Sequence, residues 1–141
     1  MKIAIINGPN LNLLGKREVD IYGGESFEGF FNYLQQKYSK FELSYFQSNI
    51  EGELINEIQR VGYEYDGIIL NPAGYTHTSV ALGDAVAAVT APLVEVHISN
   101  IFGREEFRKL SHVSAKAKGV ISGLGLKGYE LALLYFTELK F

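Results

Sequence analysis

DGIILNPAGYTHTSVALGDAVAAVTAPLVEVHI, the stretch from Asp66 to Ile98, contains two short apolar runs separated by a helical pattern. The runs Asp66–Asn71 and Leu93–Ile98 have the length and unbroken hydrophobicity of strands that are covered on both faces. Between them, Thr78 or Ser79 can cap a helix. Strand, helix and strand in this order predict a βαβ unit, and therefore a parallel sheet.

The same alternation extends to both ends of the 141-residue chain. Further strands are expected at Lys2–Asn7, Phe41–Phe46 and Gly119–Ser122. Apolar side chains repeat at helical spacing in three more segments: Phe27, Phe30, Phe31, Leu34 and Tyr38; Leu54, Ile55, Ile58 and Val61; Leu131, Leu134 and Tyr135. Ser48 and Glu51 are spaced as a capping box before the second segment. The pattern resembles an α/β, flavodoxin-like three-layer sandwich with a five-stranded parallel sheet, in one domain over residues 1–141.

Composition narrows the possible functions. A formal net charge of -3 makes nucleic acid an unexpected partner. The absence of cysteine excludes disulfides and thiolate chemistry. The chain has no apolar run long enough for a membrane span and no signal-like start, so we expect a cytoplasmic protein without membrane contact. Three histidines without a metal-binding motif predict no metal site.

One segment does not fit the alternation of strands and helices. Residues 8–25 read GPNLNLLGKREVDIYGGE, which is too long for an ordinary strand-to-helix connection, and loops of this length in compact domains are usually functional or disordered. Ligands of open parallel sheets sit at the carboxyl ends of the strands. Those ends here are rich in polar residues and glycine: NGPN (7–10), QSN (47–49), NPAGYTHTS (71–79), HISN (97–100) and SGLG (122–125). They predict a polar pocket, although ordinary turns favour the same residues.

The run LVEVHI places Glu95 and His97 on one face of a strand that otherwise looks buried. Pairing with His97 would offset the cost of burying Glu95, and it would orient the imidazole and raise its pKa, as suits a general acid. A structural pair in the core, or an edge strand with one wet face, explains the pattern equally well. His77 and His112 are weaker evidence for a functional role.

The glycines Gly123-x-Gly125-x-x-Gly128 match dinucleotide-binding spacing, but too little chain follows them for that fold.

Several motifs in order resemble the type II 3-dehydroquinate dehydratases from the first strand to the last helix. They are NGPNLNLLG (7–15) with Arg17 and Ile21-Tyr22-Gly23, FQSNIEG (46–52), NPAGYTHTSVALGD (71–84), VEVHISN (94–100), REEFR (104–108), Lys118–Gly123 and Gly128-Tyr129. The resemblance implies an anti elimination of water from 3-dehydroquinate through an enolate, giving 3-dehydroshikimate in the shikimate or quinate pathway, with no cofactor.

The resemblance also implies catalytic roles. Residues 8–25 would form a lid over the active site, and we call this segment the lid. Tyr22 in the lid would be the proton acceptor, and Arg17 would lower the pKa of Tyr22 and stabilise the transition state. Asn10 would help to hold the enolate oxygen. His97 would be the proton donor, with Glu95 orienting it.

For the substrate 3-dehydroquinate, the family pattern implies binding by Asn71, His77, Arg108 and the backbone amides of Ile98 and Ser99. Asp84 would complete the site of a neighbouring subunit, so a homo-oligomer is implied, commonly a dodecamer built from trimers. Departures from the pattern are Val19-Asp20 where the lid often has Pro-Glu, Ala73-Gly74 for Gly-Ala, and Phe102-Gly103 for His-Ala. The change in the lid bears on its stiffness. The alternative from another class is a non-catalytic flavodoxin-like binding module.

Overall fold

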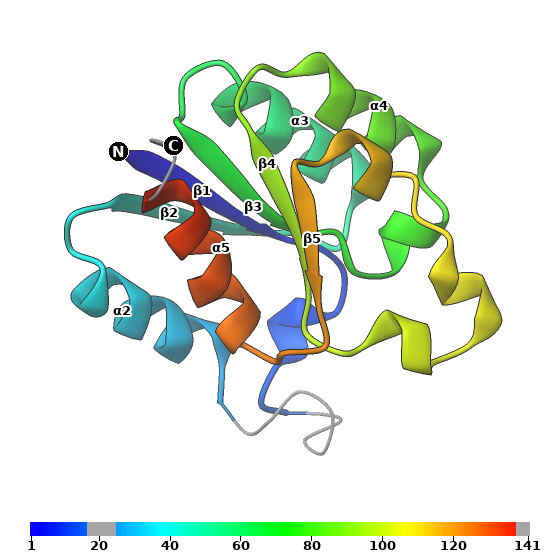
Figure 1. Cartoon of the computed structure of the whole chain (residues 1–141), viewed down its shortest axis with the longest axis horizontal. Coiled ribbons are helices and arrows are strands. Elements are labelled where there is room, and N and C mark those ends of the chain that lie inside the picture. Colours follow the sequence, from blue (N-terminus) through cyan, green and yellow to red (C-terminus); the bar gives the residue numbers. More distant parts are fainter. Residues whose placement is uncertain (17–24, 138–141) are drawn as a thin grey trace.

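The computed structural model describes residues 1–16 and 25–137 of the chain. Five parallel strands form one sheet in the order β2-β1-β3-β4-β5, which is the flavodoxin-like order (Figure 1). The strands are β1 (Lys2–Asn7), β2 (Glu42–Gln47), β3 (Gly67–Asn71), β4 (Leu93–His97) and β5 (Gly119–Ser122). Each predicted strand is confirmed, with ends that differ by at most one residue. The predicted fold class is therefore correct.

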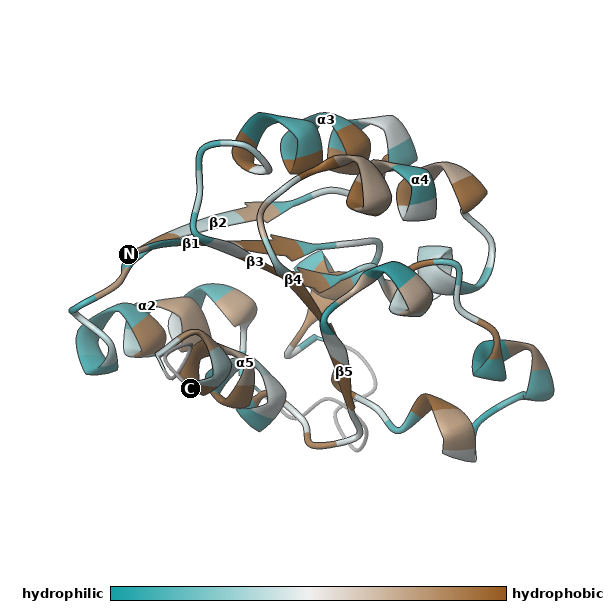
Figure 2. Cartoon of the chain, turned by 45° about the horizontal axis from the view of Figure 1, so that its top comes forward, coloured by the Kyte–Doolittle hydropathy of each residue, from teal (hydrophilic) through white to brown (hydrophobic). Residues whose placement is uncertain are grey.

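Helices cover both faces of the sheet, so the molecule has three layers (Figure 2). The helices α2 (Phe27–Lys37) and α5 (Lys127–Thr137) lie on one face, and α3 (Glu51–Val61) and α4 (Val80–Ala88) lie on the other. The short 3-10 helices are η1 (Leu11–Leu13), η2 (Ala73–His77), η3 (Ile101–Gly103), η4 (Glu106–Lys109) and η5 (Ser114–Lys116). None of the helices within residues 1–16 and 25–137 is long and apolar enough to cross a membrane.

Alternating side chains of β1 supply both hydrophobic cores. Ile3 and Ile5 belong to the cluster under α2 and α5, whereas Ala4 and Ile6 belong to the cluster under α3 and α4. All four are at most 1% exposed, and burying one isoleucine side chain contributes about 1.5–3 kcal/mol. Gly67 lets α5 approach β3 closely, because a Cβ at this position would lie 2.3 Å from the ring of Phe136.

One of the two predicted helix caps is confirmed. The hydroxyl of Ser79 accepts a hydrogen bond from the Leu82 amide at the start of α4. The capping box of Ser48 and Glu51 is wrong, because α3 begins at Glu51 itself and a capping box needs the acid two residues further into the helix. Ser48 instead accepts from the Ile50 amide, and its hydroxyl donates to Glu53.

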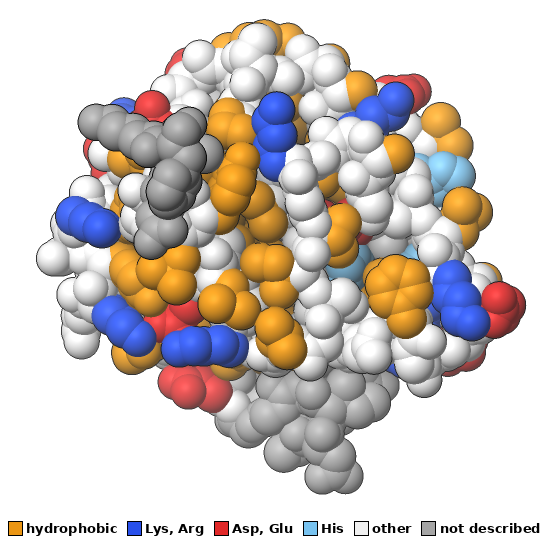
Figure 3. Space-filling model, viewed as in Figure 1, with side chains coloured by type: hydrophobic (Ala, Val, Ile, Leu, Met, Phe, Trp, Pro, Cys, Tyr) orange, Lys and Arg blue, Asp and Glu red, His pale blue; other side chains and the backbone are white. Residues whose placement is uncertain are grey.

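The apolar side chains whose spacing predicted the last helix do not form its buried face. The side chains that α5 turns toward the core are Tyr129, Ala132, Leu133 and Phe136, whereas Leu134 and Tyr135 are 43% and 39% exposed. Both stripes have helical spacing, and the segment KGYELALLYFT is apolar around most of its circumference, so periodicity alone does not select the inner face. Exposed hydrophobic side chains consequently gather on the side of the molecule where α5 and β5 lie (Figure 3).

Candidate active site

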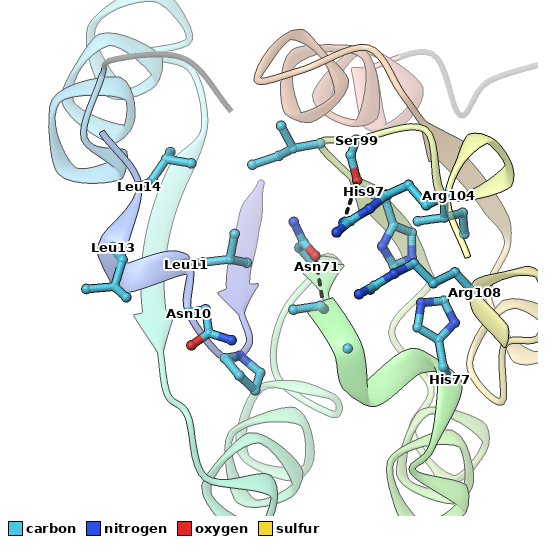
Figure 4. Close-up of a pocket in the computed structure, with 15 residues that line it drawn as sticks. Asn10, Leu11, Leu13, Leu14, Asn71, His77, His97, Ser99, Arg104 and Arg108 are labelled. Carbon is cyan, nitrogen blue, oxygen red and sulfur yellow. Dashed lines mark hydrogen bonds between the residues drawn. The ribbon is translucent and has the colours of Figure 1, made fainter. Parts of the chain in front are cut away.

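A pocket of about 270 Å³ lies at the carboxyl ends of β1, β3 and β4, as the polar strand ends predicted. Asn10 and the leucines of η1 form one side, His77, His97, Arg104 and Arg108 form the other, and Asn71 lies between them (Figure 4). The lining residues are Pro9, Asn10, Leu11, Leu13, Leu14, Asn71, Ala73, Gly74, His77, His97, Ile98, Ser99, Ile101, Arg104 and Arg108. The pocket thus combines an apolar wall with a cationic one.

The ends of β1 and β3 are held together directly below the pocket. The amide of Gly8 donates to the carbonyl of Asn71 at 2.7 Å. A Cβ at Gly8 would lie 2.7 Å from the carbonyl oxygen of Pro72, so only glycine permits this approach. Asn10 follows in the left-handed region with φ 71°, and its amide donates to Asn49 Oδ1 at 3.0 Å. These contacts fix the first turn of the segment that carries Asn10.

Asn71 is held by partners on both sides of its amide. Its Oδ1 accepts from the Ala73 amide at 3.1 Å, and its Nδ2 donates to the Tyr129 hydroxyl at 2.9 Å. The Tyr129 hydroxyl in turn donates to Asn7 Oδ1 at 2.8 Å. Burial raises the pKa of Tyr129 far above its ordinary value, so the hydroxyl keeps its proton. Asn71 therefore has one amide orientation at the floor of the pocket.

Glu95 and His97 form the pair that the alternation of β4 predicted. His97 Nε2 lies 2.7 Å from Glu95 Oε1, and the two residues are 4% and 0% exposed. Burial alone would raise the pKa of Glu95, but His97 and the hydroxyls of Ser114 and Thr76 hold that pKa below its ordinary value. The carboxylate is therefore charged, and its hydrogen bond leaves Nδ1 as the ring nitrogen of His97 that can meet a ligand.

His77 lies beside His97, with the two rings 6.4 Å apart and nearly parallel. Its Nδ1 lies 2.7 Å from the Leu110 carbonyl oxygen, which can only accept, so Nδ1 carries the hydrogen. Burial lowers the pKa of His77, despite the opposing effect of that carbonyl. A neutral ring with Nε2 available is the state that this environment favours.

Arg104 and Arg108 contribute the positive charge of the pocket. Arg108 Nε donates to Glu105 Oε2 at 2.5 Å, and Arg104 Nη1 donates to Ser99 Oγ at 3.4 Å. A ligand carboxylate could be received here by guanidinium groups and by the chain after β4. Throughout the two described ranges, no group of three His, Cys, Asp or Glu side chains could hold a metal ion.

The pocket brings together seven of the eleven predicted site residues: Asn10, Asn71, His77, His97, Ile98, Ser99 and Arg108. Glu95 lies directly behind His97. Asp84 is exposed on α4 and does not line the pocket of its own chain. Arg17 and Tyr22, with most of the lid beyond residue 16, lie outside the described residues.

Two residues near the pocket were missed as site residues by sequence reasoning. Arg104 was quoted in a motif but given no role, although it lines the pocket. Tyr129 was likewise quoted without a role, and its contacts with Asn7 and Asn71 span 122 and 58 residues of sequence. Being basic and four residues from Arg108, Arg104 offered a usable signal. No local pattern marks Tyr129.

Comparison with known proteins identifies the family. The model of the family described as "Dehydroquinase class II" matches residues 1–137. Curated proteins named 3-dehydroquinate dehydratase are similar to this chain: that of Fusobacterium nucleatum is 52% identical, with 98% of this chain and 97% of the relative covered. That of Helicobacter hepaticus is 50% identical, with 99% and 90% covered.

Solved structures agree with the sequence matches. The type II dehydroquinase from Butyrivibrio crossotus has a TM-score of 0.93 at 46% identity, with 98% of each chain covered. A 3-dehydroquinate dehydratase-like protein from Bifidobacterium longum has a TM-score of 0.71 at 31% identity, with 99% and 97% covered. The chain therefore belongs to the class II dehydroquinase family.

Proposed function

We propose that this protein is a hydro-lyase that dehydrates 3-dehydroquinate to 3-dehydroshikimate, the reaction after which its relatives are named. The observation that carries the proposal is the buried Glu95–His97 pair in the wall of a pocket that also holds two arginines. A proton donor fixed by a carboxylate, next to groups that bind an anion, suits the elimination of water from a hydroxy-acid.

In this reaction His97 is the proton donor. Its Nε2 hydrogen is held by Glu95, so Nδ1 faces the ligand and protonates the departing hydroxyl. Glu95 stabilises the imidazolium and fixes the ring, as the orienting acid of other catalytic pairs does. The acid is therefore already oriented before the substrate binds.

The base acts from the other side of the substrate ring, as an anti elimination requires. Asn10 and His97 lie on opposite sides of the pocket (Figure 4), and Asn10 begins the segment that leads to Arg17 and Tyr22. We infer that Tyr22 is the proton acceptor, that Arg17 favours the ionised phenol, and that Asn10 helps to hold the enolate oxygen. Residues 8–25 would then act as the lid of a single catalytic domain.

Substrate binding falls to groups on the cationic wall. The carboxylate is received by the amides of Ile98 and Ser99 beside the two guanidinium groups, while His77, Asn71 and Arg108 contact the ring hydroxyls. Neutral His77 offers its Nε2 as an acceptor, and Asn71 offers the second hydrogen of its Nδ2. Because these side chains are already held by protein partners, they lose little conformational freedom when the substrate binds.

We further propose that Asp84 of one subunit completes the pocket of its neighbour, in a dodecamer built from trimers. The exposed position of Asp84 on α4, away from its own pocket, supports this proposal. Mixing inactive Tyr22→Phe and Asp84→Ala proteins under verified subunit exchange should restore part of the activity, because some sites would be intact. Activity no higher than that of either parent would reject shared sites.

The cytoplasmic location stays a prediction.

The activity itself is tested with purified protein and 3-dehydroquinate, by following the absorbance of the new enone. We expect turnover that survives a chelator and borohydride, because the proposed groups need neither a metal nor a Schiff-base lysine. Covalent trapping on a lysine, or loss of turnover with the chelator that added metal restores, would contradict the mechanism.

A further inference from the structure

The carboxylate of Glu95 is enclosed by three hydroxyl groups that come from outside its own strand. Thr76 on η2 donates from Oγ1 to Oε1 at 2.5 Å, and Ser114 on η5 donates from Oγ to Oε2 at 2.5 Å. Ser111 Oγ lies 2.6 Å from Thr76 Oγ1 and 3.4 Å from Glu95 Oε1. We call Thr76, Ser111 and Ser114 the hydroxyl cage.

The hydrogen bonds of the cage all run toward Glu95. Ser111 Oγ accepts from the amides of Val113 and Ser114 at 3.1 and 3.0 Å, so its own hydrogen is available to Thr76 or Glu95. The single hydrogen of Thr76 goes to Glu95, and so does that of Ser114. A carboxylate can accept all of these bonds, whereas a protonated acid would bring a further donor into the cage. The arrangement therefore fits only the ionised form.

The backbone holds the two halves of the cage together. The amide of His112 donates to the Thr76 carbonyl at 2.8 Å. At Gly83 on α4, a Cβ would lie 2.3 Å from the His112 carbonyl oxygen, so helix α4 presses directly on this segment. Thr76 is fully buried. The hydroxyls thus have fixed positions around Glu95 before any ligand binds.

We propose that Thr76 and Ser114 are positioning residues of the reaction, which hold Glu95 as an anion and share its charge so that His97 can release its proton to the departing hydroxyl. The inference rests on the proposed function of His97 as proton donor. Each hydroxyl that donates to Glu95 takes part of the negative charge that would otherwise stabilise the His97 imidazolium. Without the cage, the more basic carboxylate would stabilise the His97 imidazolium through Nε2 more strongly, and the Nδ1 proton of His97 would be released less readily.

The inference predicts a direction for the titration of the pair. Removing one hydroxyl makes the carboxylate less stable and a stronger acceptor, so both apparent pKa values of the Glu95–His97 pair should rise. Other charged or titratable groups near the pair are His77 on η2, Arg104 after η3 and Arg108 on η4, and His112 lies in the cage segment between Ser111 and Ser114. These groups are the same in every variant, so a change in the apparent pKa values of the pair results from the lost hydroxyl.

The test is a titration of the histidine side chains by 15N NMR in the full-length protein. The chain has three histidines, and a His97→Ala protein assigns the signals. Ser114→Ala and Thr76→Val should each move the His97 titration upward by on the order of one pKa unit, the size expected for one lost charge-assisted hydrogen bond. Thr76→Ser keeps the hydroxyl and should titrate as the parent does.

A matched control is Ser48→Ala, because the Ser48 hydroxyl also donates to a carboxylate at 2.5 Å, that of Glu53, but neither residue lines the pocket. It should leave the His97 titration unchanged. An unchanged titration in both cage variants would overturn the inference, and so would an equal shift in Ser48→Ala. If Ser114→Ala does not fold, the comparison of Thr76→Val with Thr76→Ser decides.

Activity provides an independent measurement. In Ser114→Ala and Thr76→Val we expect kcat on 3-dehydroquinate to fall about tenfold with KM changed little, because the cage acts through His97 in the transition state. Thr76→Ser should retain most of kcat. If the parent protein does not turn over 3-dehydroquinate, the proposed function is wrong, but the NMR titration still decides whether the cage controls the Glu95–His97 pair.

Discussion

Replacing Tyr129 with phenylalanine should weaken both the fold and substrate binding. Tyr129 is fully buried, and its hydroxyl bonds to Asn7 Oδ1 at 2.8 Å and to Asn71 Nδ2 at 2.9 Å. Phenylalanine keeps the ring contacts with Phe27 and Phe30 but removes both bonds. Each buried polar group that loses its partner costs about 1–3 kcal/mol, so the free energy of unfolding should fall by roughly 2–4 kcal/mol.

Urea denaturation followed by circular dichroism measures this loss. The matched control is Tyr63→Phe, because the Tyr63 hydroxyl also makes a hydrogen bond, to the Ala88 carbonyl at 2.7 Å, but the residue is 63% exposed. It should cost less than about 1 kcal/mol. In Tyr129→Phe, KM should also rise more than kcat falls, because Asn71 loses its fixed orientation. Equal stability of the two variants, or an unchanged KM, would refute the reasoning.

Three further predictions concern other parts of the structure. Glu95→Gln should lower kcat by about 10- to 100-fold with little change in KM, because a neutral acceptor stabilises the His97 imidazolium less, and an unchanged steady-state kcat would contradict this role. Ala73 has φ 51°, in the left-handed region, so Ala73→Gly should raise the melting temperature or leave it unchanged, whereas glycine in an ordinary conformation lowers it. Burial would raise the pKa of Glu130, but hydrogen bonds from Lys37, Lys127, Tyr38 and Tyr33 lower that pKa from 4.5 to about 2. The ionised Glu130 therefore stabilises the fold at pH values above 4.5, and this stabilisation is lost as the pH falls from 4.5 toward 2. Glu130→Gln lacks this carboxylate, so its urea midpoint should fall less than that of the parent between pH 5 and pH 3.

The sequence predicts the fold well, because each strand and helix has a residue pattern within its own segment that identifies it. Unbroken apolar runs mark the covered strands, and the polar residues that follow them mark the edge where the pocket lies. The alternation of β4 even identifies the Glu95–His97 contact, since residues two apart on a strand point to the same side.

Contacts between distant segments explain what the sequence does not predict. The hydroxyl of Tyr129 reaches Asn7 across 122 residues, and the Thr76 hydroxyl reaches Glu95 because η2, which follows β3, lies next to β4 in the fold. The inner face of α5 is likewise decided by packing, since most of that helix is apolar. Sequence patterns describe one element at a time, and these features depend on which elements meet.

The most direct test of the central claim is the kcat of the parent and of His97→Ala on 3-dehydroquinate, measured from enone absorbance at the same pH. The account predicts turnover by the parent and a loss of about 10²- to 10⁴-fold in His97→Ala, with KM within a few-fold, because a proton donor acts mainly in the transition state. A parent protein that forms no enone, or a His97→Ala protein as active as the parent, would contradict it.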